Sequence, residues 1–275
     1  MGTTKTFWDW VSAIVSNYGQ MFLSGAGTTM LIAITGTIIG FLIGLIVAVV
    51  RTIPVLPQDN KAKKVILKIA NAIMAIYIEV FRGTPMMVQA MIVYYGLMEA
   101  FKIDLDPLTA GILIVSINTG AYMSEIVRGG IESIDEGQFD AAHAIGMTHW
   151  QTMTNVILPQ AIRNILPATG NEFVINIKDT SVLNVISVTE LFFATKTVKG
   201  IALRTFETFF VAGVIYLVLT FTVTRILRYI EKKMDGSDTY TIMASSSMPD
   251  QQFIKVRGSK HQHRPWLHEE DEQKK

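Results

Sequence analysis

Long uncharged stretches alternate with short charged ones along most of the chain. Residues 10–50 contain no charged side chain at all. Because about 20 helical residues cross the hydrocarbon core of a bilayer, this run predicts a membrane-spanning helix over 21–50. Residues 1–20 precede it and include Trp8 and Trp10, whose rings suit the bilayer interface. They predict an interfacial amphipathic N-terminus, with an ordinary helix start as the alternative.

Further apolar stretches follow and predict an all-α, polytopic membrane protein with about five transmembrane helices in a domain at 21–235. They cover roughly residues 62–101, 108–127, 156–178 and 208–224. The first of these is interrupted by polar residues and a proline, so we interpret it as one broken passage. In the first span, Gly36, Gly40 and Gly44 recur at four-residue spacing, which predicts that another helix approaches closely.

The distribution of Lys and Arg predicts the orientation in the membrane. With one broken passage, the loop 51–64, the segment 128–163 and the C-terminus share one side, and this side holds more Lys and Arg than the other. The positive-inside rule therefore places it in the cytoplasm. We expect a multi-pass protein of the bacterial plasma membrane with its N-terminus outside and its C-terminus inside. Two separate crossings would instead turn the segment 128–163 outward.

Composition excludes several classes of function. The formal net charge of +1 argues against a nucleic-acid binder, and the absence of Cys excludes disulfides and thiolate metal sites. There is no Gly-x4-Gly-Lys-Ser/Thr phosphate loop, so the chain does not hydrolyse ATP by that route. The polar tail 236–275 predicts a disordered cytoplasmic segment, and its His residues indicate solvated side chains rather than a metal site.

The polar segment 138–156 carries the most specific pattern. It contains Asp140-Ala141-Ala142, then three residues, Gly146, nine residues and Val156-Ile157-Leu158-Pro159. This pattern predicts a short helix, a tight turn with positive φ at Gly146, and a second helix that Thr148 caps. We interpret the segment as a docking knob whose small Ala residues admit a partner, with a plain amphipathic loop helix as the alternative.

The same spacing resembles the EAA loop of ABC-importer permeases: Glu-Ala-Ala, three residues, Gly, nine residues, Ile-x-Leu-Pro. Here Asp140 replaces the Glu and Val156 replaces the Ile. Further matches to the amino-acid branch of that family occur in order over about 15–235. They are Arg82-Gly83-Thr84-Pro85 with Gln89, Asn118-x-Gly120-Ala121-Tyr122, Glu125-Ile126-x-Arg128-Gly129-Gly130, Gly170-Asn171-Glu172-Phe173, Lys178-Asp179-Thr180-Ser181 and Val188-x-Glu190-Leu191.

This resemblance implies the type I ABC importer permease fold, with a cytoplasmic coupling helix that docks on an ATP-binding-cassette ATPase subunit. It assigns Asp140, Ala141, Ala142 and Gly146 to that contact. It also implies a second permease subunit, identical or related, and an extracytoplasmic substrate-binding protein. ATP and Mg would bind the ATPase, so no cofactor is expected in this chain. The implied function is import of a polar amino acid of the Gln, Glu, His or Arg class by alternating access, without catalysis by this chain.

Polar residues within the spans are candidates for the substrate pathway, because charges inside a bilayer usually face a partner or a water-filled path. The broken passage adds backbone groups that need protein or a cavity to satisfy them. The candidates are Glu79, Arg82, Thr84, Asn118, Asn171, Glu172, Lys178 and Asp179.

Structural alternatives stay open for these residues. Glu79 could pair with Arg82, Lys178 could pair with Glu172 or Asp179, and Asn118 could bridge helices. At the level of the whole chain, an ion-gradient-driven secondary amino-acid transporter is the competing function. It would predict an inverted repeat, and we see none. An intramembrane enzyme would need catalytic groups paired at membrane depth.

Overall fold

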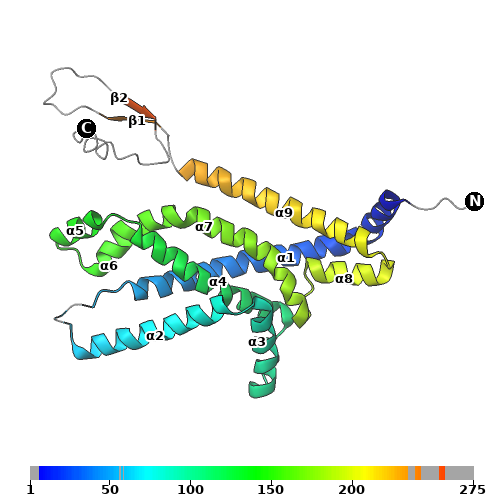
Figure 1. Ribbon diagram of the computed structural model, residues 1–275, viewed down its shortest axis with the longest axis horizontal. Helices are drawn as coiled ribbons and strands as arrows, with labels where there is room; N and C mark the ends of the chain where they lie inside the picture. Colours follow the sequence, from blue (N-terminus) through cyan, green and yellow to red (C-terminus); the bar gives the residue numbers. More distant parts are fainter. Residues whose placement is uncertain (1–5, 56, 58, 235–238, 243–253, 258–275) are drawn as a thin grey trace, which may run out of the picture. The chain divides into compact units, whose positions relative to one another are not determined.

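The computed structural model describes residues 6–55, 57, 59–234, 239–242 and 254–257. The chain forms two compact units, Met1–Arg228 and Tyr229–Lys275. The first unit is built from helices, as Figure 1 shows, and the predicted all-α membrane domain is confirmed.

Helix α1 (Phe7–Arg51) is one continuous helix of 45 residues. Thr6 begins it with a capping box, in which its side chain accepts from the Asp9 amide and the Asp9 carboxylate accepts from the Thr6 amide. At 1.5 Å per residue the helix is roughly 68 Å long, about twice the hydrocarbon thickness. Residues 7–20 therefore continue directly into the span, and their interfacial position stays a prediction.

The predicted close approach at the glycines of α1 is confirmed, and the partner is α4 (Pro107–Glu132). A Cβ added at Gly40 would lie 2.7 Å from the Thr119 Cβ, and one at Gly44 would lie 2.5 Å from the Met123 Cβ. These distances are too short for any side chain. The glycines thus let the two helix backbones pack closely along the membrane-embedded part of the unit.

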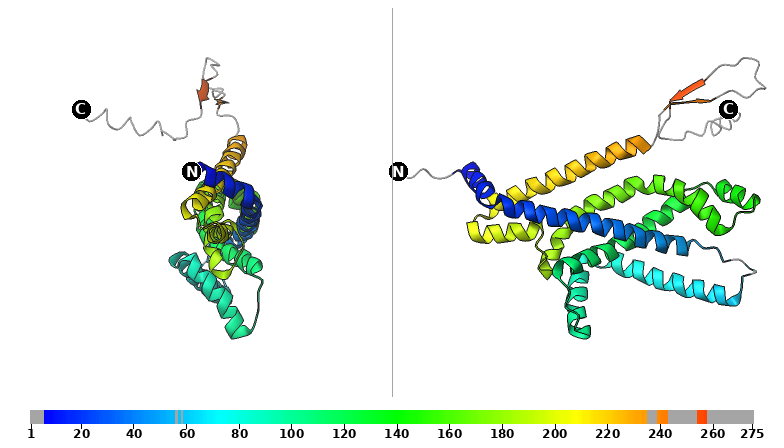
Figure 2. Two further views of the ribbon diagram at one scale, coloured as in Figure 1. Left: turned by 90° about the vertical axis from the view of Figure 1, so that its right-hand side faces the viewer. Right: turned by 180° about the vertical axis from the view of Figure 1, so that it is seen from behind.

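The predicted break in the second passage lies between α2 (Lys61–Gly83) and α3 (Met86–Phe101). Pro85 directly precedes α3 and has no N–H to continue the hydrogen-bond ladder of α2. Helix α3 turns away and stands across the direction of α2, as both Figure 1 and the right-hand view of Figure 2 show.

The remaining helices of the chain follow α4, and the last of them runs past Arg228 into the second unit. They are α5 (Glu136–Ala144), α6 (His149–Thr152), the π-helical η1 (Met153–Ile157), α7 (Leu158–Asp179), the 3-10 helix η2 (Thr180–Ile186), α8 (Leu191–Ala202) and α9 (Thr205–Met234). Helices α5 and α6 lie at one end of the bundle, while α8 and the start of α1 lie at the opposite end (Figures 1 and 2).

Among the described residues, three helices are long and apolar enough to cross a membrane: Phe7–Arg51, Pro107–Glu132 and Thr205–Lys233. The pair His149–Ile186 and Leu191–Ala202, bent by 57°, could form one more span. Helix α3 is apolar but has only 16 residues. The broken α2–α3 passage therefore remains the predicted fifth span.

The second unit contains a two-stranded antiparallel sheet. Strand β1 (Thr239–Ile242) pairs with β2 (Ile254–Arg257), and Thr239 lies opposite Arg257. The sequence indicates no strand in this tail. The other residues of 236–275 lie outside the described ones, so their disorder stays a prediction.

Candidate functional site

Helices α5 and α6 form a compact elbow around Gly146. We call residues 136–152 the coupling elbow. Gly146 has a φ of +82°, and the amide of the next residue, Met147, donates to the Ala142 carbonyl at 3.1 Å. Thr148 caps α6 in a capping box with Gln151. The predicted positive φ and the predicted N-cap are both confirmed.

The inner face of the coupling elbow packs against the helix bundle. Ala142 is only 3% exposed, because it faces the protein interior. Successive helical residues point about 100° apart, so the neighbouring Ala141 is exposed instead. The prediction that both Ala residues face a partner is therefore wrong for Ala142. The core beneath the elbow consists of Ala48, Val127, Ile131, Ile134, Met153, Ile157, Ala161 and Ile165.

The outer face of the elbow exposes apolar side chains. Ile145 is 75% exposed and Trp150 is 67% exposed, while Asp140 and Gly146 are exposed nearby in sequence. Large apolar side chains on a surface that is otherwise polar are typical of a protein interface. The exposed part of the predicted contact thus consists of Asp140, Ala141 and Gly146.

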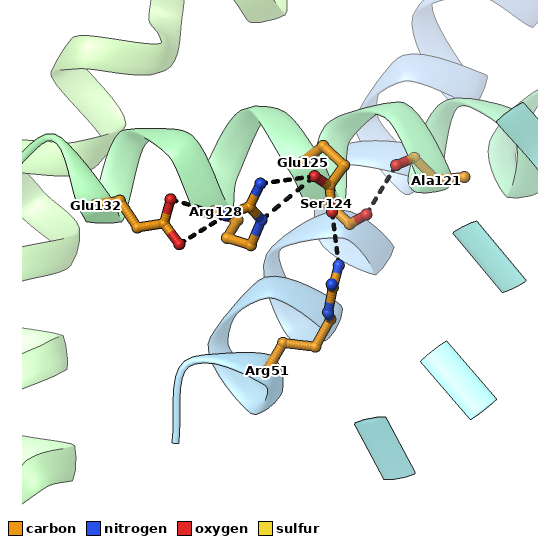
Figure 3. Close-up of polar contacts among 6 residues, drawn as sticks. All are labelled: Arg51, Ala121, Ser124, Glu125, Arg128 and Glu132. Atoms are coloured by element: carbon orange, nitrogen blue, oxygen red, sulfur yellow. Dashed lines mark hydrogen bonds and ion pairs between the residues drawn. The ribbon is translucent and has the colours of Figure 1, made fainter. Parts of the chain in front are cut away.

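A series of ion pairs joins the end of α1 to α4, as Figure 3 shows. Arg51 donates to Glu125 at 2.6 Å, and Arg128 donates to the other oxygen of Glu125 at 2.9 Å. Arg128 also binds Glu132 at 2.6 Å. We call these four residues the charge ladder. It gives the Glu-x-x-Arg motif of the sequence a structural role, because each charge in it has a partner of opposite sign.

The charge ladder borders a cavity of about 620 Å³ behind the coupling elbow. Arg51, Arg128 and Glu132 form one part of its wall, and Asp140 and His149 of the elbow form another. The elbow is therefore not packed against α1 and α4 over its whole inner surface.

A π-helical turn, η1, joins the elbow to α7. The Leu158 amide donates to the Met153 carbonyl, five residues earlier. The next residue is Pro159, which has no N–H to offer the carbonyl four residues before it. The wider turn is consistent with that missing donor, and π-helical turns frequently occur at functional sites.

Two amide side chains donate hydrogen bonds to the backbone carbonyls at the break between α2 and α3. Gln89 Nε2 donates to the carbonyls of Phe81 and Thr84, each at 2.9 Å. Asn118 Nδ2 donates to Gln89 Oε1 at 2.9 Å and to the Phe81 carbonyl at 3.3 Å. The alternative that Asn118 bridges helices is thus confirmed. Thr84 donates to the Val80 carbonyl, so its hydroxyl is also engaged in the break.

Glu79 and Arg82 do not pair in the part of the chain that the structure describes, which contradicts the structural alternative for them. The Arg82 guanidinium instead lies 5.5 Å from the ring centroid of Tyr122 on α4. Both charged side chains are exposed on α2. A cation–π contact leaves the hydrogen-bond donors of Arg82 available.

Helix α7 presents two different polar faces. Glu172 is 9% exposed, and within the described residues it makes no hydrogen bond or ion pair. One turn further on, Asn176 donates to Thr37 of α1 at 2.8 Å and to Thr119 of α4 at 3.0 Å. The face with Glu172 and Asn176 is therefore directed toward α1 and α4.

Lys178 lies on the other face, where with Val174 it borders a cavity against α9. Lys178 pairs with neither Glu172 nor Asp179 among the described residues, so both predicted pairings are wrong. Asn171 and Asp179 are exposed. The candidate pathway residues consequently fall into separate places rather than one site.

Two polar contacts were missed by the sequence analysis. One is the Asn176 contact with two helices, for which an amide within an apolar run was the available signal. The other surrounds Glu190, which is fully buried and caps α8 by accepting from the amides of Phe192 and Phe193, each at 2.7 Å. Tyr216 of α9 donates to the same carboxylate at 3.1 Å.

The fold and the coupling elbow define a class: a helical membrane protein with a short two-helix elbow that exposes apolar side chains at one end of its bundle. Residues 62–236 match the family model described as "Binding-protein-dependent transport system inner membrane component". The chain is 38% identical to the glutamine transport system permease protein GlnP of Escherichia coli over 215 residues, which cover 78% of this chain and 93% of that protein.

Two further similarities agree with the match to this family of transport components. The arginine transport system permease protein ArtQ of Bacillus subtilis is 33% identical over 216 residues, with 78% of this chain and 93% of that protein covered. A solved structure described as an amino acid ABC transporter with histidines is 35% identical, has a TM-score of 0.70, and covers 84% of this chain and 100% of that one. The chain belongs to the family of binding-protein-dependent transport system inner membrane components. It is thus a transport component rather than an enzyme.

Proposed function

We propose that this chain is the permease subunit of an ATP-driven importer that carries a polar amino acid across the bacterial plasma membrane by alternating access. The names of its relatives, which are glutamine and arginine transport systems, support a substrate of the Gln, Glu, His or Arg class. The N-terminus lies outside and the C-terminus in the cytoplasm. A second permease subunit and an extracytoplasmic binding protein complete the transporter.

The coupling elbow is the observation that carries this proposal. Its exposed Ile145 and Trp150 offer an apolar contact to a separate ATPase subunit, which binds ATP and Mg. Its inner face packs on the ends of α1 and α4, and η1 connects it to α7. A displacement of the elbow by the ATPase therefore reaches three helices of the bundle, and the cavity behind it provides room for the movement.

Within the membrane, Glu172 and Arg82 are the best-supported pathway residues. Glu172 is a buried carboxylate without a partner in the described part of the chain, and Arg82 keeps its donors free beside the break. A carboxylate and a guanidinium suit the ammonium and carboxylate groups of an amino acid. Thr84 and Asn118 support the break instead, and they contribute to the pathway by positioning it.

The docking proposal is tested with Gly146→Asp in the chain co-expressed with its ATPase. An Asp side chain at a φ of +82° adds strain and a charge on the outer face of the elbow. We expect co-purification of the ATPase to fall below about a tenth of the wild-type amount, an affinity loss of about 1.4 kcal/mol or more, while membrane insertion is retained.

Gly146→Asn is the matched control, because Asn tolerates positive φ and adds no charge. It should keep most of the ATPase. Normal co-purification of Gly146→Asp would contradict docking at the elbow. Uptake that persists in proteoliposomes without the ATPase, and that follows an ion gradient, would favour the secondary transporter instead.

A further inference from the structure

A cationic cavity of about 290 Å³ lies between α7 and α9. Lys178 of α7 and Arg225 and Arg228 of α9 border it, together with the hydroxyl side chains of Thr220 and Thr224. The rest of its wall is apolar and consists of Val174, Leu217 and Phe221. No acidic side chain of the described residues is part of this wall.

Of the three cations of this cavity, only Lys178 has a carboxylate nearby among the described residues, because its neighbour Asp179 interacts with it electrostatically. None of them forms an ion pair within the described parts of the chain, and Arg225 stacks on the Phe221 ring at 4.8 Å from its centroid. Arg51 and Arg128 of the charge ladder, in contrast, are both paired with carboxylates. Unpaired cations next to a bilayer are costly, so a group of negative charge that this chain does not supply is expected here.

The cavity lies where the apolar part of α9 ends. Residues 208–224 of α9 carry no charged side chain, and Arg225 is the first charge after them. Gly170 of α7 faces Leu227, so this end of α9 packs against the middle of α7. Basic pockets between spanning helices on the cytoplasmic side of a membrane bind anionic lipid head groups.

The apolar wall distinguishes a lipid from a free amino acid. Leu217 is 65% exposed and Phe221 is 56% exposed, so the cavity wall continues into an open apolar surface along α9. An acyl chain would cover this surface, whereas a free amino acid has no group that could. The charge and the adjoining apolar surface together match a phosphate that is attached to hydrocarbon chains.

We propose that the cavity binds the phosphate group of an anionic phospholipid. Lys178, Arg225 and Arg228 supply the positive charge and the hydrogen-bond donors, while the hydroxyls of Thr220 and Thr224 donate to the Tyr216 and Thr220 carbonyls of α9 itself. The acyl chains lie along Leu217 and Phe221. A lipid held in this way connects the last turns of α7 to the C-terminal half of α9.

The test measures lipid binding to the full chain in complex with its ATPase, in detergent, by native mass spectrometry. The probes are dioleoyl phosphatidylglycerol and dioleoyl phosphatidylcholine. We expect the wild type to retain phosphatidylglycerol preferentially, and Arg225→Gln/Arg228→Gln to lower that affinity about thirtyfold, at about 1 kcal/mol per cation near the surface. Arg163→Gln, an exposed arginine of α7 outside the cavity, should bind as the wild type does.

Three results would overturn the proposal. They are equal affinity of the wild type for both lipids, undiminished phosphatidylglycerol binding by the double variant, and displacement of the bound lipid by millimolar L-glutamate or L-glutamine. The last would assign the cavity to a free carboxylate ligand. If the double variant does not elute as a folded complex, Lys178→Gln replaces it, with about a fivefold loss of affinity expected for one cation.

Discussion

The four charged side chains of the charge ladder are paired, whereas Glu172 and Lys178 of α7 and Arg225 and Arg228 of α9 form no ion pair within the described residues. At the coupling end, Arg51, Glu125 and Arg128 each contact a residue of opposite charge within 2.9 Å. In the described part of α7, Glu172 and Lys178 have no ion-pair partner. Both regions contain motifs of the same family and charged residues of both signs. The difference between them is therefore whether these charges contact one another within the chain.

A paired charge adds a connection within the chain, while an unpaired one at membrane depth must be neutralised from outside it. The charge ladder therefore belongs to the frame that holds α1 and α4 together. For Glu172 and the cations of the α7–α9 cavity, we propose that substrate and lipid supply the missing partners. The same conservative substitution should then have opposite effects on the stability of the two regions.

The largest effect is expected for Glu125→Gln in the charge ladder. The side chain is 23% exposed, and its neutralisation leaves Arg51 without its partner and Arg128 with only Glu132. Since charge-assisted hydrogen bonds contribute about 2 kcal/mol, we expect a loss of roughly 2 kcal/mol in the free energy of unfolding. Thermal unfolding of the detergent-solubilised chain measures it.

Glu132→Gln is the matched control within the same ladder. Glu132 is 58% exposed and contacts Arg128 alone, so its loss should cost less than about 1 kcal/mol. Equal unfolding temperatures for Glu125→Gln and the wild type would show that the ladder does not stabilise the α1–α4 junction.

A smaller effect is expected for Asn176→Ala. The Asn176 amide connects α7 to Thr37 of α1 and Thr119 of α4, and the side chain is 3% exposed. Without it, the two hydroxyls can still turn to carbonyls of their own helices, so we expect a loss of about 1 kcal/mol. Asn171→Ala, an exposed position on the same helix, should unfold like the wild type. Equal unfolding of the two variants would contradict a structural role for Asn176.

The coupling elbow was largely predictable from the sequence, because its determinants are local. Gly146 demands a positive φ and Thr148 caps a helix over a few residues of chain, and the structure has both features. The orientation of Ala142 was not predictable, because it depends on how α5 lies on the ends of α1 and α4.

The pathway was less predictable, because it depends on contacts between residues far apart in the chain. The sequence identified the break after Gly83 and the polar residues around it, but not that Gln89 and Asn118 satisfy its carbonyls. Similarly, adjacent residues such as Lys178 and Asp179 suggest a pair. In the structure Lys178 faces α9 instead, because neighbouring residues of a helix point in different directions.

The smallest effect on stability is expected for Glu172→Gln. Since Glu172 is buried without a partner in the described part of the chain, losing its charge removes a desolvation cost and breaks no contact, so the unfolding temperature should stay equal or rise. Uptake should nevertheless change, with KM raised about tenfold if the carboxylate binds the substrate ammonium, a difference of about 1.4 kcal/mol. Glu99→Gln, exposed on α3, should leave both unchanged. Wild-type uptake kinetics in Glu172→Gln would remove Glu172 from the pathway, and a large loss of stability would place it with the paired charges of the ladder.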